Sequence, residues 1–264
     1  ELGKEIRKAF VADEGYKIIS LDYSQIELRL AAHMSGDVKM IKAFKEGKDI
    51  HAATAAEING VPLDEITPAM RREAKAINFG ILYGQGPRGL SQTADISYER
   101  AREFIEEYFK AYEGVKKYID ASIAEAREKG YTETLFGRKR YLPEINSSVM
   151  QIKKTAERMA INTPLQGTAA DLIKVAMIII APLINLSSTA IGKGVGGIFN
   201  DNNRDIKMLL QVHDELLFEI KTSKIKEWLP KIKQAMEKIL KLKVPIEVDV
   251  SVGDNWGEME KIKI

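Results

Sequence analysis

The segments richest in strand-forming residues lie at the two ends of this 264-residue chain. YKIISLD ends at Asp22, and LLQVHDELLFEI and IEVDVSV both follow residue 205. Their β-branched, aromatic and alternating apolar residues are typical of strands, whereas most of the sequence between them has helical periodicity. We therefore expect an α+β fold in which one antiparallel sheet is assembled from both ends of the chain and a helical lobe is inserted.

Turn and capping residues predict the remaining elements. A further strand is expected at AFVA, residues 9–12, and a hairpin at 131–145 that turns at Gly137. Helices are expected over 149–186 and 224–240. The Ser, Gly and Asn residues between Asn185 and Asp205 have no regular period and predict a long loop.

Composition excludes several classes of protein. The chain has no cysteine, which rules out disulfides, thiolate metal sites and thiol nucleophiles. The longest apolar run, Val175 to Ile184, is far short of the ~20 residues of a membrane helix, so no membrane partner is expected. The net charge of +2 does not indicate a nucleic-acid-binding protein. Any such function must come from local clusters of charge.

Acidic residues stand at the ends of two predicted strands. Asp22 ends one strand, and His213, Asp214 and Glu215 interrupt an apolar segment where a tight hairpin turn fits. Two aspartates brought together repel by about 4 kcal/mol at 4 Å and an effective dielectric of 20, whereas Mg²⁺ favours such hard oxygen ligands. The alternative is that Asp214 and Glu215 are ordinary turn residues and Asp22 caps the next helix.

The segment PAMRREAKAINFGILYG predicts a helix with two distinct faces. At about 100° per residue, Met70, Ala74, Ile77 and Ile81 form one apolar stripe. The other stripe consists of Arg71, Lys75, Phe79 and Tyr83. Its cations suit phosphate oxygens and its aromatic rings suit base stacking. In the alternative reading both aromatics pack against a second buried surface, which leaves Lys75 unexplained.

Two weaker patterns add candidates. Arg158, Asn162 and Gln166 are spaced by four, either to contact a nucleic-acid backbone or minor groove or as interior polar groups. His51 falls in the first turn of a helix that Asp49 is expected to cap. Most lone histidines at such a position lie at the surface.

Several long motifs resemble one known family. DYSQIELR (22–29), RREAKAINFGILYG (71–84) and QVHDE (211–215) are similar to the palm and fingers motifs of family-A DNA polymerases, the bacterial polymerase I type. RMAINTPLQGTAAD, TLFGRKRYLP and GKDIHAATA also match. The resemblance covers nearly the whole chain and places the three main motifs in the order of the family.

The resemblance implies an antiparallel palm sheet with packed helices and an inserted, mostly helical fingers lobe. The implied parts are palm at 1–32, fingers at 33–155 and palm again at 156–264, with a flexible loop at 187–205 in place of the family's short connection. The thumb, an earlier palm segment and any exonuclease domain are expected to lie outside this chain, N-terminal to it. The implied function is template-directed DNA synthesis by two-metal-ion nucleotidyl transfer.

The resemblance also implies a role for each matching residue. The implied metal ligands are Asp22, Asp214 and the main-chain carbonyl of Tyr23, with Glu215 as a secondary acid near the primer end. The implied triphosphate ligands are His51, Arg71 and Lys75, and Lys75 is also the candidate proton donor to pyrophosphate. Phe79 and Tyr83 are expected to border the incoming base and sugar, and Glu27 to crowd a ribose 2′-hydroxyl. The expected primer and template contacts are Arg158, Asn162, Gln166 and His213.

The implied cofactor is Mg²⁺, as two ions for which Mn²⁺ substitutes, and the implied partners are primer-template DNA and deoxynucleoside triphosphates. We expect a monomer located with the nucleoid in the cytoplasm. Two other functions remain open. One is a non-catalytic nucleic-acid-binding remnant of a polymerase without a thumb, and the other is a metal-dependent nuclease.

Overall fold

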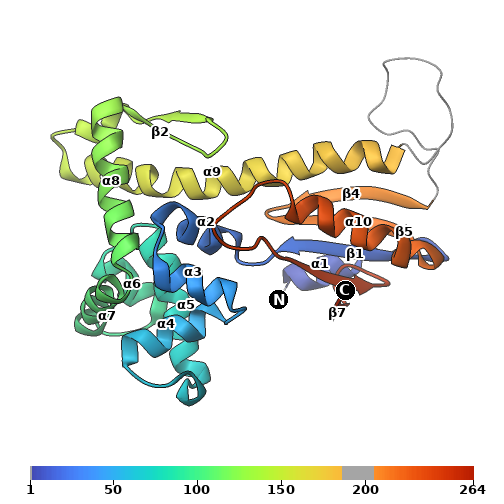
Figure 1. The fold of residues 1–264 in the computed structure, drawn as a ribbon, viewed down its shortest axis with the longest axis horizontal. Helices are drawn as coiled ribbons and strands as arrows, with labels where there is room; N and C mark the ends of the chain where they lie inside the picture. The colour runs from blue at the N-terminus through green and yellow to red at the C-terminus, as the bar shows by residue number, and fades with distance from the viewer. Residues whose placement is uncertain (1, 186–204) are drawn as a thin grey trace. The chain divides into compact units, whose positions relative to one another are not determined.

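The structure is a computed structural model that describes residues 2–185 and 205–264 (Figure 1). The chain forms two compact units. Unit 1 comprises residues 1–24, 170–241 and 246–264, and unit 2 comprises residues 25–169 and 242–245. The loop predicted at 187–205 lies outside the described residues, apart from Asp205.

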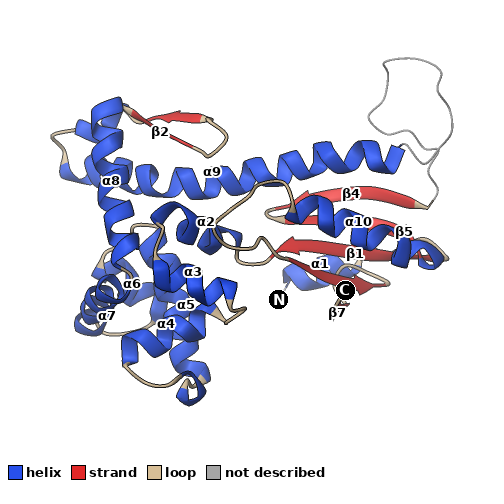
Figure 2. Cartoon of the chain, viewed as in Figure 1, coloured by secondary structure: helices blue, strands red, loops and turns tan. Residues whose placement is uncertain are grey.

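Unit 1 is built on a five-stranded antiparallel sheet with strand order β4-β5-β1-β6-β7, drawn in red in Figure 2. Its strands are β1 (Tyr16–Tyr23), β4 (Ile206–Val212), β5 (Glu215–Lys221), β6 (Val248–Gly253) and β7 (Met259–Ile262). The first strand of the chain is therefore central and is flanked by strands from the C-terminal part. This confirms the predicted α+β fold with a sheet assembled from both ends and a helical insert.

The register of β1 sets the core of unit 1. Ile19 pairs with Phe218, and Leu21 pairs with Leu216. All four side chains are completely buried, and large buried apolar side chains each contribute about 1.5 to 3 kcal/mol. A slip of one residue would turn these side chains to the other face of the sheet, so the apolar pattern fixes which residues of β1 and β5 stand opposite each other.

One prediction for the N-terminus is wrong. Residues 9–12 do not form a strand. The chain begins with a short helix, α1 (Leu2–Lys8), and Val11 makes only an isolated bridge to Asn255. Phe10 instead places its ring edge-on to Trp256, with centroids 5.6 Å apart. Tertiary packing of this kind readily overrides β propensity in so short a segment.

Helix α10 (Ile225–Glu237), entered through the short η3 (Thr222–Lys224), packs against the sheet within unit 1. The buried side chains of this helix are Trp228, Leu229, Ile232 and Met236. The Tyr23 hydroxyl donates to the main-chain carbonyl of Met236 at 3.0 Å, and Lys233 Nζ donates to that of Val248 at 2.7 Å. These bonds fix the C-terminal end of β1 beneath the helix.

Unit 2 is mostly helical. Its elements are α2 (Ile26–Ser35), α3 (Val38–Lys45), α4 (Ile50–Asn59), η1 (Leu63–Glu65), α5 (Pro68–Leu82), α6 (Pro87–Ala94), α7 (Tyr98–Ala111), α8 (Glu113–Lys129), β2 (Tyr131–Glu133), β3 (Lys139–Tyr141) and η2 (Pro143–Asn146). The side chains of Asp37, Asp49, Thr67 and Ser97 each accept a hydrogen bond from the first turn of the helix that follows. Such caps satisfy main-chain N–H groups that have no partner within the helix. The predicted hairpin is confirmed, and Gly137 supplies its left-handed residue at φ +79°.

Helix α9 (Met150–Asn185) contributes residues to both units. Within residues 2–185 and 205–264 it is the one helix long and apolar enough, by length and composition alone, to cross a membrane. A core helix of a water-soluble protein meets the same criterion. Leu172, Ile173, Ala176 and Ile180 of α9 are buried in unit 1, whereas Ile178, Ile179 and Leu183 are exposed.

Among the glycines of unit 1 that the structure describes, Gly253 at the end of β6 has the backbone atoms closest to the position of an added Cβ. A Cβ atom at this position would lie 2.4 Å from the Glu258 carbonyl oxygen and 2.9 Å from that of Asn255. We predict that Gly253→Ala destabilises unit 1 by about 2 kcal/mol, because backbone cannot move away as a flexible side chain can.

The measurement is urea unfolding followed by tryptophan fluorescence, since Trp228 and Trp256 both belong to unit 1. Gly3→Ala is the matched control, because a Cβ at Gly3 meets nothing within 4 Å. Equal unfolding midpoints for Gly253→Ala and wild type would contradict the prediction.

Candidate active site

In unit 1, acidic side chains meet at one end of the sheet. Asp22, near the end of β1, stands directly opposite Glu215 of β5 on one side and Asp249 of β6 on the other. Directly opposed side chains of an antiparallel pair lie on the same face with Cβ atoms about 5 Å apart. The sheet therefore gathers three acids from segments that are far apart in the sequence.

A fourth acid, Asp214, lies in the tight turn between β4 and β5, as predicted. The turn consists of His213 and Asp214, and His213 adopts the left-handed conformation at φ +55°. The main-chain N–H of Tyr23 donates to the Asp214 carbonyl at 3.1 Å. This bond ties the turn to the end of β1, so Asp214 is held beside Asp22. Asp22 itself lies within β1, and Gln25 occupies the N-cap position of the following helix α2 without a side-chain cap bond, so the alternative in which Asp22 caps that helix is wrong.

The Asp22 carboxylate is electrostatically strained. Burial, followed by the charges of Asp214, Glu215 and Asp249, raises the pKa of Asp22 to about 7. Its Oδ1 atom is buried without a hydrogen-bond partner among the described residues. Burial is also the main cause of a raised pKa for Asp214. Each of these effects opposes the ionised form, and the charge of Lys261 has a smaller, opposite effect on Asp22.

Two of the acids are already engaged. Glu215 Oε1 accepts hydrogen bonds from Ser20 Oγ at 2.5 Å and from Trp256 Nε1 at 3.1 Å. Asp249 Oδ2 accepts from Lys261 Nζ at 2.9 Å. Sequence reasoning missed Asp249, although the alternation of IEVDVSV places it on the same face as its flanking polar residues. Its proximity to Asp22 could be inferred only from the pairing of β6 with β1.

The geometry fits a divalent cation that takes only part of its ligands from protein. No group of three or more His, Cys, Asp or Glu side chains in the described ranges could hold a metal ion by itself. Mg²⁺ typically uses one or two carboxylates and completes its octahedron with water and substrate phosphates. Asp22 and Asp214 match that requirement, and the unpartnered Oδ1 of Asp22 is a suitable ligand atom.

In unit 2, helix α5 has the two faces that its sequence predicts. Thr67 caps the helix and Pro68 occupies its first turn. On the apolar stripe Ala74, Ile77 and Ile81 are buried. On the opposite stripe Lys75 is exposed and the other three members, Arg71, Phe79 and Tyr83, are partly exposed. The reading in which Phe79 and Tyr83 pack against a second fully buried surface is therefore wrong.

Helix α4 supports this second stripe from one side. The Asp49 side chain caps α4 by accepting from the His51 and Ala52 N–H groups, both at 2.9 Å, which confirms the predicted cap. Its other oxygen accepts from Arg71 Nε at 3.0 Å and Nη2 at 2.6 Å. The guanidinium of Arg71 is thus oriented by the start of α4.

His51 is only 3% exposed, so the alternative reading of an ordinary surface histidine is wrong. The His51 side chain packs against α5, with its ring centroid 5.8 Å from that of Phe79. Burial, opposed by the charge of Asp49 and reinforced by the charges of Arg71 and Lys75, lowers the pKa of His51 to about 4. The imidazole is therefore neutral at physiological pH.

Contacts extend from Phe79 on the α5 stripe, through Tyr83, to Glu27 on α2. The ring centroids of Phe79 and Tyr83 are 6.0 Å apart. The Tyr83 hydroxyl donates to Glu27 Oε2 at 2.9 Å. Glu27 belongs to α2, so this bond joins the end of α5 to the helix that follows β1. His51, Phe79, Tyr83 and Glu27 are therefore linked by successive contacts, and Arg71 and Lys75 share the α5 stripe with Phe79 and Tyr83.

The polar row of α9 lies at the surface. Arg158 and Gln166 are exposed, which excludes the interior reading for these two. Asn162 is half-buried, and its Nδ2 donates to the Tyr83 carbonyl at 3.5 Å. Gln166 lines a pocket of about 320 Å³ together with Arg138, Lys139 and Arg140. The net charge of the whole chain is only +2, but basic side chains cluster at this pocket.

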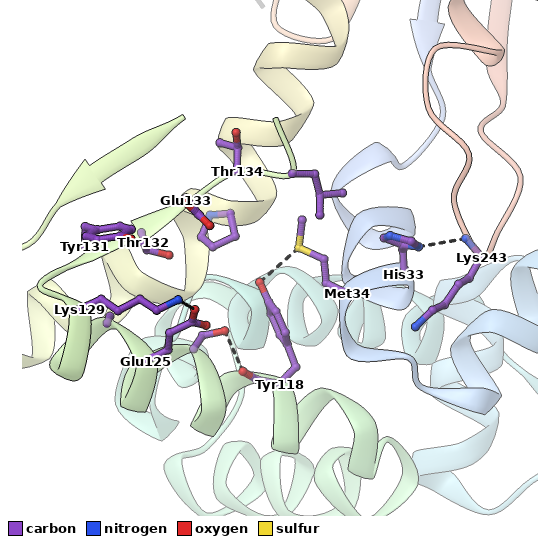
Figure 3. Close-up of a pocket in the computed structure, with 14 residues that line it drawn as sticks. His33, Met34, Tyr118, Glu125, Lys129, Tyr131, Thr132, Glu133, Thr134 and Lys243 are labelled. Atoms are coloured by element: carbon purple, nitrogen blue, oxygen red, sulfur yellow. Dashed lines mark hydrogen bonds and ion pairs between the residues drawn. The ribbon is translucent and has the colours of Figure 1, made fainter. Parts of the chain in front are cut away.

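A second pocket of about 420 Å³ contains none of the predicted site residues (Figure 3). Some of the residues labelled there interact with one another. Tyr118 donates to Met34 Sδ at 3.4 Å, His33 Nδ1 accepts from the Lys243 N–H at 3.0 Å, and Lys129 pairs with Glu125. Several polar groups of this pocket therefore already have protein partners.

Comparison with known proteins identifies the family. The sequence profile of DNA polymerase family A matches residues 1–258. The chain is 47% identical to the thermostable DNA polymerase I of Thermus thermophilus over 255 residues, which is 97% of this chain and 28% of that protein. It is 43% identical to DNA polymerase I of Pseudomonas aeruginosa, covering 97% of this chain and 26% of that protein.

A solved structure agrees with these relatives. The POL domain of Pol1 from M. smegmatis, in complex with DNA primer-template and dNTP, matches with a TM-score of 0.86 and 43% identity. The match covers 97% of this chain and 43% of that one. This chain thus spans less than a third of the length of the curated relatives given above. With a family profile along nearly its whole length and relatives above 40% identity, the chain belongs to DNA polymerase family A.

Proposed function

We propose that this chain is the catalytic part of a longer polymerase and performs template-directed DNA synthesis. The observation that carries the proposal is the convergence of Asp22 and Asp214 at one end of the sheet, tied by the Tyr23 to Asp214 main-chain bond. The row of cations and aromatics on α5 supports it, since a nucleotide needs both kinds of contact. Family membership supplies the reaction class.

In the proposed reaction, the primer 3′-oxygen attacks the α-phosphorus of a deoxynucleoside triphosphate. A new P–O bond forms to the primer, the bond between the α-phosphorus and the bridging oxygen breaks, and pyrophosphate leaves. The 3′-hydroxyl loses a proton and pyrophosphate gains one. Protein groups contribute to such a transfer mainly by positioning reactants and stabilising charge.

We assign Asp22 and Asp214, with the Tyr23 carbonyl, as the ligands of divalent metal. Two bound Mg²⁺ ions would stabilise the charge on the attacking and leaving oxygens. Strand β1 carries Asp22, and a main-chain bond ties the turn that carries Asp214 to the end of that strand, so that little reorganisation is needed when the substrate arrives. Glu215, held by Ser20 and Trp256, is assigned as the secondary acid toward the primer end.

We assign the stripe of Arg71, Lys75, Phe79 and Tyr83 on α5, together with His51 of α4, to nucleotide binding. Arg71 and Lys75, with His51, bind the triphosphate, and Lys75 donates the proton to departing pyrophosphate. Phe79 and Tyr83 border the base and sugar. Arg158, Asn162, Gln166 and His213 contact primer and template, where the neighbouring Arg138, Lys139 and Arg140 add favourable charge for phosphate.

Primer extension with Mg²⁺ and deoxynucleotides tests the proposal. It is run with the 264-residue chain and with the same chain joined to the preceding polymerase segment of the Thermus thermophilus relative. Template-dependent extension by either protein supports DNA synthesis. Primer binding without extension by both proteins would favour a non-catalytic DNA-binding protein, and primer degradation would favour a nuclease. A nuclease would have no use for the stripe of Arg71, Lys75, Phe79 and Tyr83 on α5.

Replacing a proposed metal ligand tests the chemistry directly. We predict that Asp214→Asn lowers the rate of extension by about a hundredfold or more. Losing a metal ligand removes several kcal/mol of transition-state stabilisation. Asp254→Asn is the matched control, since Asp254 is an exposed residue that pairs with Lys17. Extension at wild-type rate by Asp214→Asn would show that the metal assignment is wrong.

The raised pKa of Asp22 predicts a pH-dependent stability. Because the folded pKa of about 7 exceeds the usual aspartate pKa of 3.8, the folded chain binds the proton more tightly and loses stability as pH rises between about 4 and 7. Asparagine mimics the protonated form. We therefore predict that Asp22→Asn is more stable than wild type above about pH 7 and equally stable below about pH 4.

The test is urea unfolding of unit 1, followed by tryptophan fluorescence in EDTA at about pH 4 and about pH 8. Adding Mg²⁺ at the higher pH should stabilise wild type more than Asp22→Asn. A lower unfolding midpoint for Asp22→Asn at the higher pH would contradict the proposed strain.

Glu27 offers a test of sugar selection. We predict that Glu27→Ala raises ribonucleotide incorporation relative to deoxynucleotide by about tenfold or more, because a truncated side chain no longer crowds a 2′-hydroxyl. Tyr83→Phe is the control, since it removes the hydroxyl that donates to Glu27 but leaves the carboxylate in place. Unchanged sugar discrimination in Glu27→Ala would remove Glu27 from this role.

A further inference from the structure

Asn78 is a polar residue on the buried face of α5. It is 0% exposed and lies one turn from Ala74 and Ile81 on the apolar stripe. Burying an amide costs free energy unless its donors and acceptor are paired. The partners of Asn78 therefore indicate why an amide is placed here rather than an aliphatic side chain.

The amide nitrogen of Asn78 has two partners on α4. Nδ2 lies 3.1 Å from His51 Nδ1 and 3.1 Å from Thr54 Oγ1. The shortest contact of the Thr54 hydroxyl is 2.8 Å, to the Ile50 carbonyl, and this uses its single proton. Thr54 Oγ1 then acts as an acceptor toward Asn78 Nδ2, and both Asn78 Oδ1 and the Tyr112 hydroxyl also lie 3.2 Å from it. Both N–H groups of Asn78 are thereby used, one for Thr54 and one for His51.

This arrangement determines the tautomer of His51. A ring nitrogen that accepts a hydrogen bond carries no proton, so the single N–H of the neutral ring must be at Nε2. The charged groups around the ring are Asp49 on its own helix and Arg71 and Lys75 on α5. Burial outweighs the attraction of Asp49 and keeps the ring neutral.

We propose that Asn78 is a positioning residue, which holds His51 in the Nε2–H tautomer so that it donates one directed hydrogen bond to a phosphate oxygen of the incoming nucleotide. The tautomer assignment stands on the α4 and α5 contacts alone. The role toward phosphate rests on the proposed function. Arg71 and Lys75 supply the positive charge in this scheme, and His51 supplies a donor whose direction is fixed before the substrate binds.

The tautomer can be measured without any activity. The chain has three histidines, His33, His51 and His213, so ring-¹⁵N-labelled histidine gives a simple spectrum that His51→Gln assigns. We expect His51 Nδ1 to have the chemical shift of an unprotonated nitrogen and Nε2 that of an N–H. A proton on Nδ1 in wild type would overturn the proposal.

The isosteric variant Asn78→Asp tests the cause. Its carboxylate accepts hydrogen bonds and has no N–H to donate, so we expect the His51 proton to move to Nδ1. Asn59→Asp is the matched control, since Asn59 lies on the same α4 helix and donates instead to the Ala55 carbonyl at 2.8 Å. An unchanged His51 spectrum in folded Asn78→Asp would show that Asn78 does not set the tautomer.

The role toward phosphate is tested by the binding of dTTP with Mg²⁺, measured by calorimetry on the full chain. We expect Asn78→Asp to weaken binding about tenfold in the wild-type background and less than about twofold in the His51→Gln background. Equal losses in both backgrounds would show that Asn78 acts through the general structure of α5. If wild type fails to bind dTTP, the triphosphate site of the proposed function is wrong, whereas the ¹⁵N spectrum still tests the tautomer separately.

Discussion

The antiparallel pairing of β1 with β5 is the interaction on which the candidate site depends. It joins residues almost two hundred positions apart in sequence and buries Ile19 and Leu21 against Phe218 and Leu216. The same register sets Asp22 opposite Glu215 and holds the Asp214 turn against Tyr23. The hydrophobic free energy of the pairing offsets the repulsion among the acids. The apolar core thus maintains a charged arrangement that would not assemble by itself.

Unit 2 carries the side chains that we assign to phosphate binding. Helix α5 uses its buried stripe to pack against the rest of unit 2 and its other stripe to present Arg71 and Lys75. Asp49 orients Arg71 and caps α4, while Asn78 of α5 orients His51 of α4. Hydrogen bonds between these two helices therefore fix the direction of the candidate phosphate donors. Such preorganisation is what a phosphoryl-transfer site requires, since the protein contributes little covalent chemistry.

Periodicity and turn chemistry predicted those features that depend on local sequence. The two faces of α5, the tight turn at His213 and Asp214, and a sheet built from both chain ends were all confirmed. The predictions that failed depended on long-range packing. Residues 9–12 have strand-like composition, but Phe10 packs on Trp256 instead of pairing in the sheet. The charged segment of β7 was missed because an edge strand needs few apolar residues.

Local sequence patterns could not predict the burial of His51 or the roles of Asn78 and Asp249. These features depend on how the helices and strands pack against one another. A polar residue on a predicted apolar stripe, as at Asn78, is the one signal in the sequence that could have indicated a buried network. The assignments of individual site residues to metal, nucleotide and DNA remain predictions. The most direct test of the central claim is Mn²⁺ binding by the full chain, followed by the electron paramagnetic resonance signal of free Mn²⁺. We predict bound Mn²⁺ that Mg²⁺ displaces and that either Asp22→Asn or Asp214→Asn abolishes, whereas equal Mn²⁺ binding by both variants and wild type would contradict the account.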